Sequence, residues 1–421
     1  MSRKNSNGIV NSFAVITESF RSVNIDENGI LQLLDCRMFL HLFEDVPDFR
    51  DQVKITYKLS NLLMMVFLCV LERGKISYTA IADLIEAKEK KYVQYGLLNQ
   101  GEFPSHDTVR RILTLLDSDA LYENTLQGFY AFLQSLENHL IKAGEYKHIA
   151  FDGKEIRGSG RSKDTQKPKR NMAMLNVYDS GLNTVVSCIP IGEKENEIPV
   201  SQQILRVMNL KNTVATADAL HCQKDTAFLI DHKKGIYVLT VKDNQPSLLE
   251  EIQIRFDNPK SKISGYERDK RSIELLDLPK NYALSDEWAG LKTFVRMRSV
   301  KGKKDTVRYF ISNTKDHRLI IEAIEKRWSC ETMHKLKDMD LYEDAVRSTD
   351  KGALTNIALL NNLAVQLFHL YASISGKEFR KAKVYFQVNP VECLNLILGV
   401  MSSEEIIDSL IKDLTKKKRN R

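Results

Sequence analysis

The spacing of apolar residues changes along this chain of 421 residues, from a helical period to a strand period near residue 147. Between about residues 36 and 140, apolar residues recur every three to four positions, as in "FPSHDTVRRILTLLDS", which predicts amphipathic helices. After residue 147, short apolar runs are bounded by polar or turn residues, which predicts strands. These runs are "HIAFD", "NMAMLNVYD", "NTVVSCIPI", "NTVATAD" and "IYVLTV".

Between the strands, helices are predicted at 199–209 and 222–233. The resulting order β-β-β-α-β-α-β predicts the α/β class, with a mixed sheet flanked by helices. A further strand, "TVRYFISN", precedes a long helix from about 316 to 337. The chain is therefore divided into an N-terminal segment (1–35), an α-helical N-terminal domain (36–140), an α/β domain (141–345) with an irregular charged insertion (about 245–305), and a helical C-terminal segment (346–421) with the basic tail "TKKKRNR".

Composition narrows the class of protein further. Apolar residues make up 43% of the chain, and the net charge of +7 is compatible with nucleic acid without requiring it. The six cysteines are scattered and form no Cys-x-x-Cys pair, which argues against a zinc knuckle or a redox pair. The most apolar run, Leu62–Leu71, is far shorter than the ~20 residues that span a bilayer. We expect a soluble, cytoplasmic protein with no membrane partner.

One pair of predicted helices in the first domain is a candidate for DNA contact. Two short helices joined by a Gly-containing turn resemble a helix-turn-helix. Arg110 and Arg111 lie near the start of the second helix, where such motifs meet DNA. The alternative is an ordinary helical bundle with solvated arginines.

Two aspartates follow predicted strands. Asp152 ends the first strand and Asp218 ends another, on the same face as Val214 and Thr216. The active sites of open α/β sheets lie at the ends of the strands, so these two carboxylates are expected to meet. The alternative for either residue is a turn former or a helix cap.

Glu331 is the third candidate acid. It extends the apolar stripe of Ile321, Ile324 and Trp328 on the long helix, where an unpaired charge is costly. A salt bridge to Arg327 is the alternative. Three carboxylates can hold two hard divalent cations ~3.5–4 Å apart, as in phosphoryl transfer. The basic run "KEIRGSGRSKDTQKPKR" after Asp152 fits a phosphodiester substrate.

At these motifs the sequence resembles the H-repeat-associated branch of insertion-sequence transposases, which carry a DDE triad on an RNase H-like fold. The resemblance rests on "FEDVPDFRDQVKITYKLSNLL", "IAFDGKEIRGS", "TADALHCQKDTA", "YVLTVKDNQPSLLEEI" and "RWSCETMHKLKDMDLYEDAVR". It implies that Asp152, Asp218 and Glu331 are catalytic and hold the metal ions. Cys330 and Thr332 depart from the family's glutamate motif, and Glu343 of "YEDA" is the alternative third acid.

The resemblance also implies partners and further site residues. We expect two Mg²⁺ ions, replaceable by Mn²⁺, double-stranded DNA (the terminal inverted repeats of the element and its target), a homodimer or larger assembly on DNA, and a place on the bacterial nucleoid. Residues expected to contact DNA are Lys154, Arg157, Arg161, Lys163, Arg110, Arg111, Lys242 and Arg327, and residues expected to support the site are Glu193, Glu197, Asn244, Gln245 and His334.

Two other functions stay open from the sequence. One is a transposase-derived DNA-binding protein that no longer cuts, because the segment around Glu331 departs from the family motif. The other is a metal-dependent DNA nuclease on the same fold, which would cut without joining.

Overall fold

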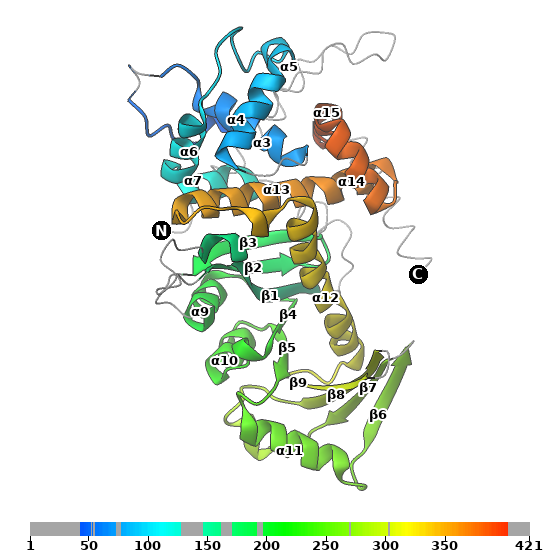
Figure 1. Cartoon of the computed structure of the whole chain (residues 1–421). Helices are drawn as coiled ribbons and strands as arrows, with labels where there is room; N and C mark the ends of the chain where they lie inside the picture. Colours follow the sequence, from blue (N-terminus) through cyan, green and yellow to red (C-terminus); the bar gives the residue numbers. More distant parts are fainter. Residues whose placement is uncertain are drawn as a thin grey trace.

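The computed structural model describes residues 43–402, apart from 52, 54, 73–76, 128–145, 161–170, 192–196, 269–270 and 302–303. In this part of the chain the molecule is elongated, with a helical region at one end and a sheet that extends to the other (Figure 1). The predicted segment 1–35 and the basic tail lie outside the described residues.

One continuous mixed β-sheet runs through the α/β part, as predicted. In the described residues it has nine strands in the order β3-β2-β1-β4-β5-β9-β8-β7-β6. The first three are antiparallel, and β4 and β5 run parallel to β1, which is the arrangement of an RNase H-like fold. These five strands are β1 (Lys147–Ile156), β2 (Met172–Asp179), β3 (Thr184–Ile191), β4 (Thr213–Ala217) and β5 (Ile236–Val241).

The segment 245–305 is regular, in contrast to the expectation of an irregular insertion. It forms α11 and three antiparallel strands, which join the sheet through β9 beside β5. β6 is exposed along nearly its whole length, so it lacks the alternation of apolar and polar residues that marks a half-buried strand. The elements are α11 (Pro246–Asp257), β6 (Ile263–Arg268), β7 (Arg271–Asp277), β8 (Thr293–Lys301) and β9 (Lys304–Ser312).

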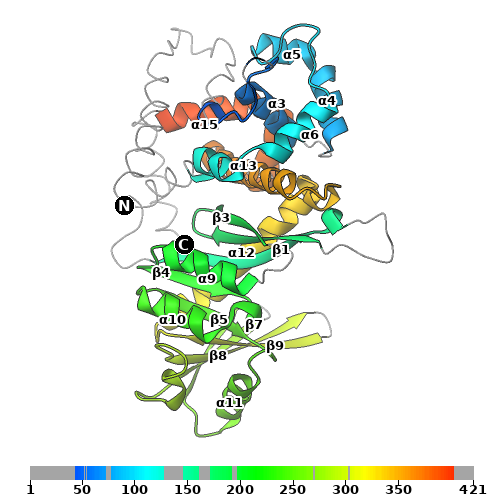
Figure 2. The ribbon, with the colours of Figure 1, turned by 90° about the vertical axis from the view of Figure 1, so that its left-hand side faces the viewer.

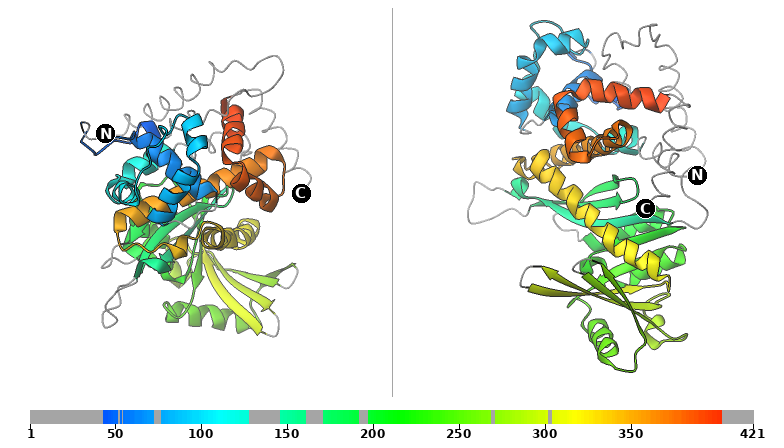
Figure 3. Two further views of the ribbon diagram at one scale, coloured as in Figure 1. Left: turned by 45° about the horizontal axis from the view of Figure 1, so that its top comes forward. Right: turned by 90° about the vertical axis from the view of Figure 1, so that its right-hand side faces the viewer.

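Helices cover both faces of the sheet. α9 (Glu197–Val207) and α10 (Lys224–His232) pack on one face, where their apolar residues share a core with β1, β4 and β5 (Figure 2). α12 (His317–Asp340) crosses the opposite face diagonally (Figure 3, right). Its N-terminal half packs on β4, β5, β7 and β8, and the predicted helix of 316–337 is confirmed.

A long buried helix, α13 (Lys351–Ser375), lies between the helical region and the sheet (Figure 1). It is long and apolar enough to cross a membrane, but 94% of its most apolar window is buried inside the protein, so it serves as a core helix. It packs directly on β3 and on the helices α3 (Leu59–Leu71), α6 (His106–Leu115), α7 (Ser118–Tyr122), α14 (Phe379–Val388) and α15 (Pro390–Ser402). The helices α4 (Tyr78–Ala87) and α5 (Glu89–Gln94) belong to the same core.

A buried amide on α13 ties this helix to the end of α6. The fully buried Asn356 donates to the carbonyl oxygens of Leu113 and Leu116, at 2.9 and 3.0 Å. We predict that Asn356→Ala lowers the free energy of unfolding by about 1–3 kcal/mol, because two buried carbonyls lose their donor. Urea denaturation measures this, with Ser373→Ala on the exposed side of the same helix as control. Equal effects of the two substitutions would contradict the assignment.

Candidate active site

Asp152 and Asp218 stand side by side on neighbouring parallel strands. Phe151 of β1 and Ala217 of β4 form the last pair of the ladder between these strands, and the two aspartates are the next residues along each chain. Phe151 and Ala217 belong to the core under α9 and α10. Because successive side chains of a strand point to opposite faces, Asp152 points toward the α12 face, where it contacts His334. Asp218 follows the last residue of β4 at the same level of the sheet. The prediction that Asp152 ends its strand is wrong, since β1 continues to Ile156 beside β2.

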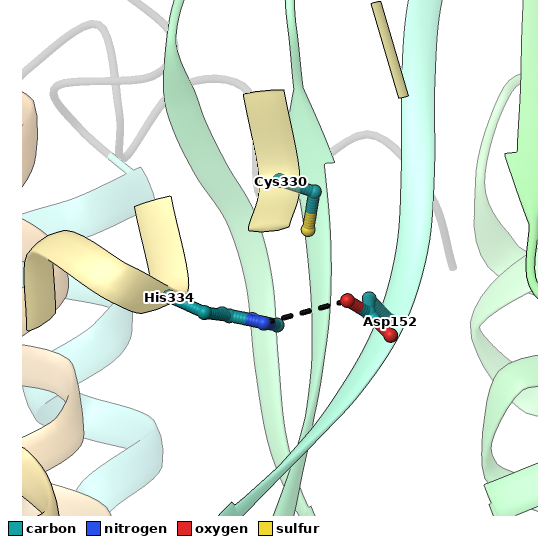
Figure 4. A group of neighbouring side chains, drawn as sticks. All are labelled: Asp152, Cys330 and His334. Atoms are coloured by element: carbon teal, nitrogen blue, oxygen red, sulfur yellow. Dashed lines mark ion pairs between the residues drawn. The ribbon is translucent and has the colours of Figure 1, made fainter. Parts of the chain in front are cut away.

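The Asp152 carboxylate faces two side chains of α12 (Figure 4). Its Oδ2 atom lies 3.4 Å from Nδ1 of His334, and Nε2 of the same ring lies 3.3 Å from Nδ2 of Asn176. With Sγ of Cys330, the carboxylate and the imidazole form a group whose potential metal-ligating atoms all lie within 4.8 Å of one another, the one such group among the described residues. The structure therefore places His334, a predicted supporting residue, beside Asp152.

Side-chain hydrogen bonds hold the turn that follows Asp218. Its carboxylate accepts a hydrogen bond of 3.1 Å from the N–H of Leu220 and caps the 3₁₀ turn η4 (Ala219–His221). Asn244 and Gln245 donate from their side-chain amides to carbonyl oxygens of this turn and of the residue after it, at 2.6 and 2.9 Å. The capping role that we considered as an alternative for Asp218 is thus present, in a turn that the predicted residues Asn244 and Gln245 hold.

Glu331 is exposed, whereas we expected it on the inward face of the helix. The buried face of α12 includes Cys330 instead, and Glu331, the next residue along the helix, lies outside this face. Burial, together with the negative charges of Asp152 and Glu331, raises the pKa of the Cys330 thiol well above its usual value. The Glu331 carboxylate is outside the group of ligand atoms around Asp152.

Arg327, expected to contact DNA or to pair with Glu331, is directed toward β5. Its Nη1 donates to Oγ1 of Thr240 at 3.1 Å, and this hydroxyl in turn donates to the carbonyl oxygen of Ala217 at 3.1 Å. Because Ala217 precedes Asp218, the chain of two hydrogen bonds joins α12 to the strand that carries the second aspartate.

Lys154, predicted to contact DNA, is buried in an ion-pair network. Its ammonium nitrogen lies 2.7 Å from Asp338, 3.0 Å from Glu343 and 3.2 Å from Asp344. Glu343 also lies 3.1 Å from the ammonium of Lys337. Lys154 is 7% exposed, Glu343 1% and Lys337 not at all. An ammonium group enclosed by carboxylates in this way is not open to a phosphate, in contrast to the expectation.

Glu343, the alternative third acid, occupies the centre of this network. Burial alone would raise the pKa of its carboxyl, but the charges of Lys337 and Lys154 outweigh burial and lower the pKa to about 2. The amide of Asn361 on α13 donates to it at 3.3 Å. Glu343 is thus held between two lysines, and it joins β1 to α12 and α13 just beyond Asp152 and His334.

The remaining predicted residues lie around this edge or on the surface. Glu197 begins α9, where its carboxylate contacts Gly153 and lies 3.6 Å from Nε2 of the buried His221. A side chain at position 153 would have to displace this carboxylate. Lys242, Arg157, Arg110 and Arg111 are exposed, the last two on α6. Glu193, Arg161 and Lys163 lie outside the described residues.

Two buried polar residues of the site were missed by the sequence analysis. Asn176 stands opposite Asp152 in the β1–β2 register, and Thr240 bridges Arg327 to β4. Each interrupts an otherwise apolar strand, "NMAMLNVYD" or "IYVLTV". Because buried polar groups require partners, such interruptions are the signal that could have identified them.

Comparison with known proteins identifies the family of this chain. Residues 143–367 match the family model described as "Transposase DDE domain", and residues 40–127 match the one described as "DDE_Tnp_1-associated". The chain is 30% identical over 361 residues to "Putative transposase YncI" of Escherichia coli O157:H7, which covers 80% of this chain and 89% of the relative. It is 26% identical over 346 residues to "H repeat-associated putative transposase YhhI" of Escherichia coli K12, covering 76% and 88%.

The chain therefore belongs to the transposases with a DDE domain, and the resemblance to the H-repeat-associated branch is confirmed. Domains of this family generally use divalent metal ions. Among solved structures, a piggyBac transposase in a synaptic complex with hairpin DNA aligns with 95% of this chain and 81% of its own, at 13% identity and a TM-score of 0.41.

The buried network predicts a large effect of neutralising Glu343. Glu343→Gln should lower the free energy of unfolding by about 3–5 kcal/mol at neutral pH, because it leaves the buried ammonium groups of Lys154 and Lys337 without their shared carboxylate. The pKa of Glu343 in the folded protein is lowered, so this stabilisation is complete above the ordinary glutamate pKa of 4.5 and is lost as pH falls toward about 2. The difference from wild type should shrink over that window.

The matched control is Glu287→Gln, which breaks an exposed ion pair with Lys224 at 2.6 Å. Its effect should stay within about 0.5 kcal/mol, because exposed pairs contribute little. Urea denaturation of both variants between pH 7 and pH 3 makes the measurement. A Glu343 variant as stable as the control would rule out an energetic role for the network.

Proposed function

We propose that this protein binds the terminal inverted repeats of its own insertion sequence, cuts the DNA at the ends of the element, and joins the freed 3′-hydroxyls to target DNA. The observation that carries the proposal is the placement of Asp152 and Asp218 at the same level of adjacent parallel strands, with Asp152 facing α12. Membership of the DDE transposases makes polynucleotidyl transfer the chemistry to test at this site.

The donor set fits hard divalent cations, which we propose to be two Mg²⁺ ions with Mn²⁺ as a substitute. Asp152 and Asp218 offer carboxylate oxygens, the ligands that Mg²⁺ prefers. We assign both residues, with Glu331, as ligands. When bound, the ions would favour deprotonation of the attacking hydroxyl and stabilise the leaving oxygen of the phosphodiester. His334 would fix the orientation of the Asp152 carboxylate through its 3.4 Å contact.

DNA would be held by the helical region and by the surface beside the site. We propose contacts from Arg110 and Arg111 on α6, from Arg157 beyond β1 and from Lys242 beyond β5, all exposed. Joining two element ends in one event calls for a dimer or larger assembly on DNA in the bacterial cytoplasm. The position of Glu331 keeps one second candidate, a DNA-binding descendant that no longer cuts, because this carboxylate lies outside the Asp152 group.

Single neutral substitutions test the three acids. Asp152→Asn, Asp218→Asn and Glu331→Gln should each lower the rate of Mg²⁺-dependent end cleavage by at least ~10²-fold while binding of end DNA persists, because each removes a charge assigned to metal binding. Labelled element-end DNA and a target plasmid report nicking and joining, and a mobility shift reports binding. Asp225→Asn, on the neighbouring helix α10, is the control and should cut normally.

Three outcomes separate the candidate functions. Binding of end DNA by the wild type without cleavage would establish the non-cutting descendant instead. Cleavage without joining and without preference for element ends would indicate a nuclease. A Glu331→Gln protein that still cuts at the wild-type rate would remove Glu331 from the assigned triad.

The Arg327–Thr240–Ala217 chain of hydrogen bonds makes a separate prediction. Thr240→Val keeps the β-branched shape but removes the hydroxyl, so α12 and the strand before Asp218 lose their link. We expect cleavage to slow by about 10- to 100-fold, because a small misplacement of the groups in a site has an effect of this size. DNA affinity should be unchanged. Thr240→Ser keeps the hydroxyl and should restore most of the rate. Equal rates for the valine and serine variants would show that the hydroxyl does not position the site.

A further inference from the structure

Asp152, Cys330 and His334 differ from the oxygen-only donor set that suits magnesium. They offer one carboxylate oxygen, one sulfur and one imidazole nitrogen, from two elements that are packed against each other (Figure 4). Cys330 and His334 are four residues apart on α12, so both side chains lie on the face turned to β1. Sulfur and imidazole ligands favour Zn²⁺ and related thiophilic ions over Mg²⁺.

The separations of these atoms agree with a single small ion. The distance of 3.4 Å between Asp152 Oδ2 and His334 Nδ1 is longer than a good hydrogen bond. It matches the edge of a tetrahedron whose metal–ligand bonds are about 2.1 Å, the length typical of zinc with nitrogen and oxygen. The sulfur lies within 4.8 Å of one carboxylate oxygen of Asp152 and one ring nitrogen of His334. The Asp152 side chain is 26% exposed, which leaves a solvent side for a water ligand.

The surroundings of the imidazole support a role as a metal ligand. A histidine that binds metal through one nitrogen usually donates a hydrogen bond from the other to an oxygen. Nε2 of His334 faces the side-chain amide of Asn176, which is fully buried and whose Oδ1 atom has no hydrogen-bond partner. Turning this amide by 180° lets Oδ1 accept from the Nε2–H group, leaves the Nδ1 lone pair directed at Asp152, and moves Nδ2 to the place where Oδ1 has no partner.

We propose that Asp152, Cys330 and His334 form a binding site for a thiophilic divalent cation such as Zn²⁺. Because Asp152 is also assigned to the magnesium site, occupancy of the proposed site withdraws this carboxylate from catalysis. The metal site itself is argued from the geometry alone, whereas the loss of catalysis rests on the proposed function. Zinc would therefore act as an inhibitor that competes for one shared ligand.

Cobalt binding to the full chain without DNA tests the site directly. Co²⁺ replaces Zn²⁺ in such sites, and its thiolate complex has a charge-transfer band in the near ultraviolet. We expect the band in the wild type, its loss in Cys330→Ser, and its retention in Cys222→Ser, which alters a buried cysteine of the α9–α10 core. Competition with a chromogenic chelator should show at least ~10-fold weaker Zn²⁺ binding in Cys330→Ser. Thermal unfolding confirms that each variant is folded.

Two results would overturn the site: no thiolate band in the folded wild type, or a band of equal strength in folded Cys330→Ser. The inhibition is tested by end cleavage in Mg²⁺ with added Zn²⁺, each protein normalised to its own rate without zinc. Wild type and Cys222→Ser should be inhibited, and Cys330→Ser should need at least ~10-fold more zinc. Equal inhibition of all three would overturn the competition for Asp152. A wild type that binds cobalt through Cys330 but never cuts would refute the proposed function and leave the metal site standing.

Discussion

The parallel register of β1 and β4 is the constraint on which the candidate site depends. Backbone hydrogen bonds set Phe151 opposite Ala217, so the next residue of each strand emerges at the same level. The backbone register, and not the conformation of a long loop, therefore brings these two residues to one edge of the sheet.

The helix α12 is fixed to the sheet on both sides of the site. On one side Arg327 reaches Thr240 on β5, and on the other Lys337 shares Glu343 with Lys154 of β1. Between these anchors, Cys330 and His334 are turned to Asp152. Because interactions with buried charge are strong and directional, the separation between strand and helix is set by the protein itself before any ligand binds.

Much of this arrangement could be predicted from the sequence, and the failures have physical causes. The strand and helix periods identified the sheet, α12 and the two aspartates, because local alternation reports burial directly. In the segment 245–305, β6 was missed because its residues are nearly all exposed, and β8 because its buried run includes the charged Arg296. Lys154 and Glu331 were misplaced because a sequence shows charge but not the partners that neutralise it or the phase of a long helix. Glu343 became interpretable only once Lys154 and Lys337, far apart in the chain, were seen on either side of it.

The position of α13 has a consequence for how the molecule can move. The two family models are separated along the chain, yet α13 comes from the second and completes the core of the first. The helical region and the first strands of the sheet therefore share one hydrophobic interior and should move as one rigid body. A hinge between the two matched regions would have to break this shared interior.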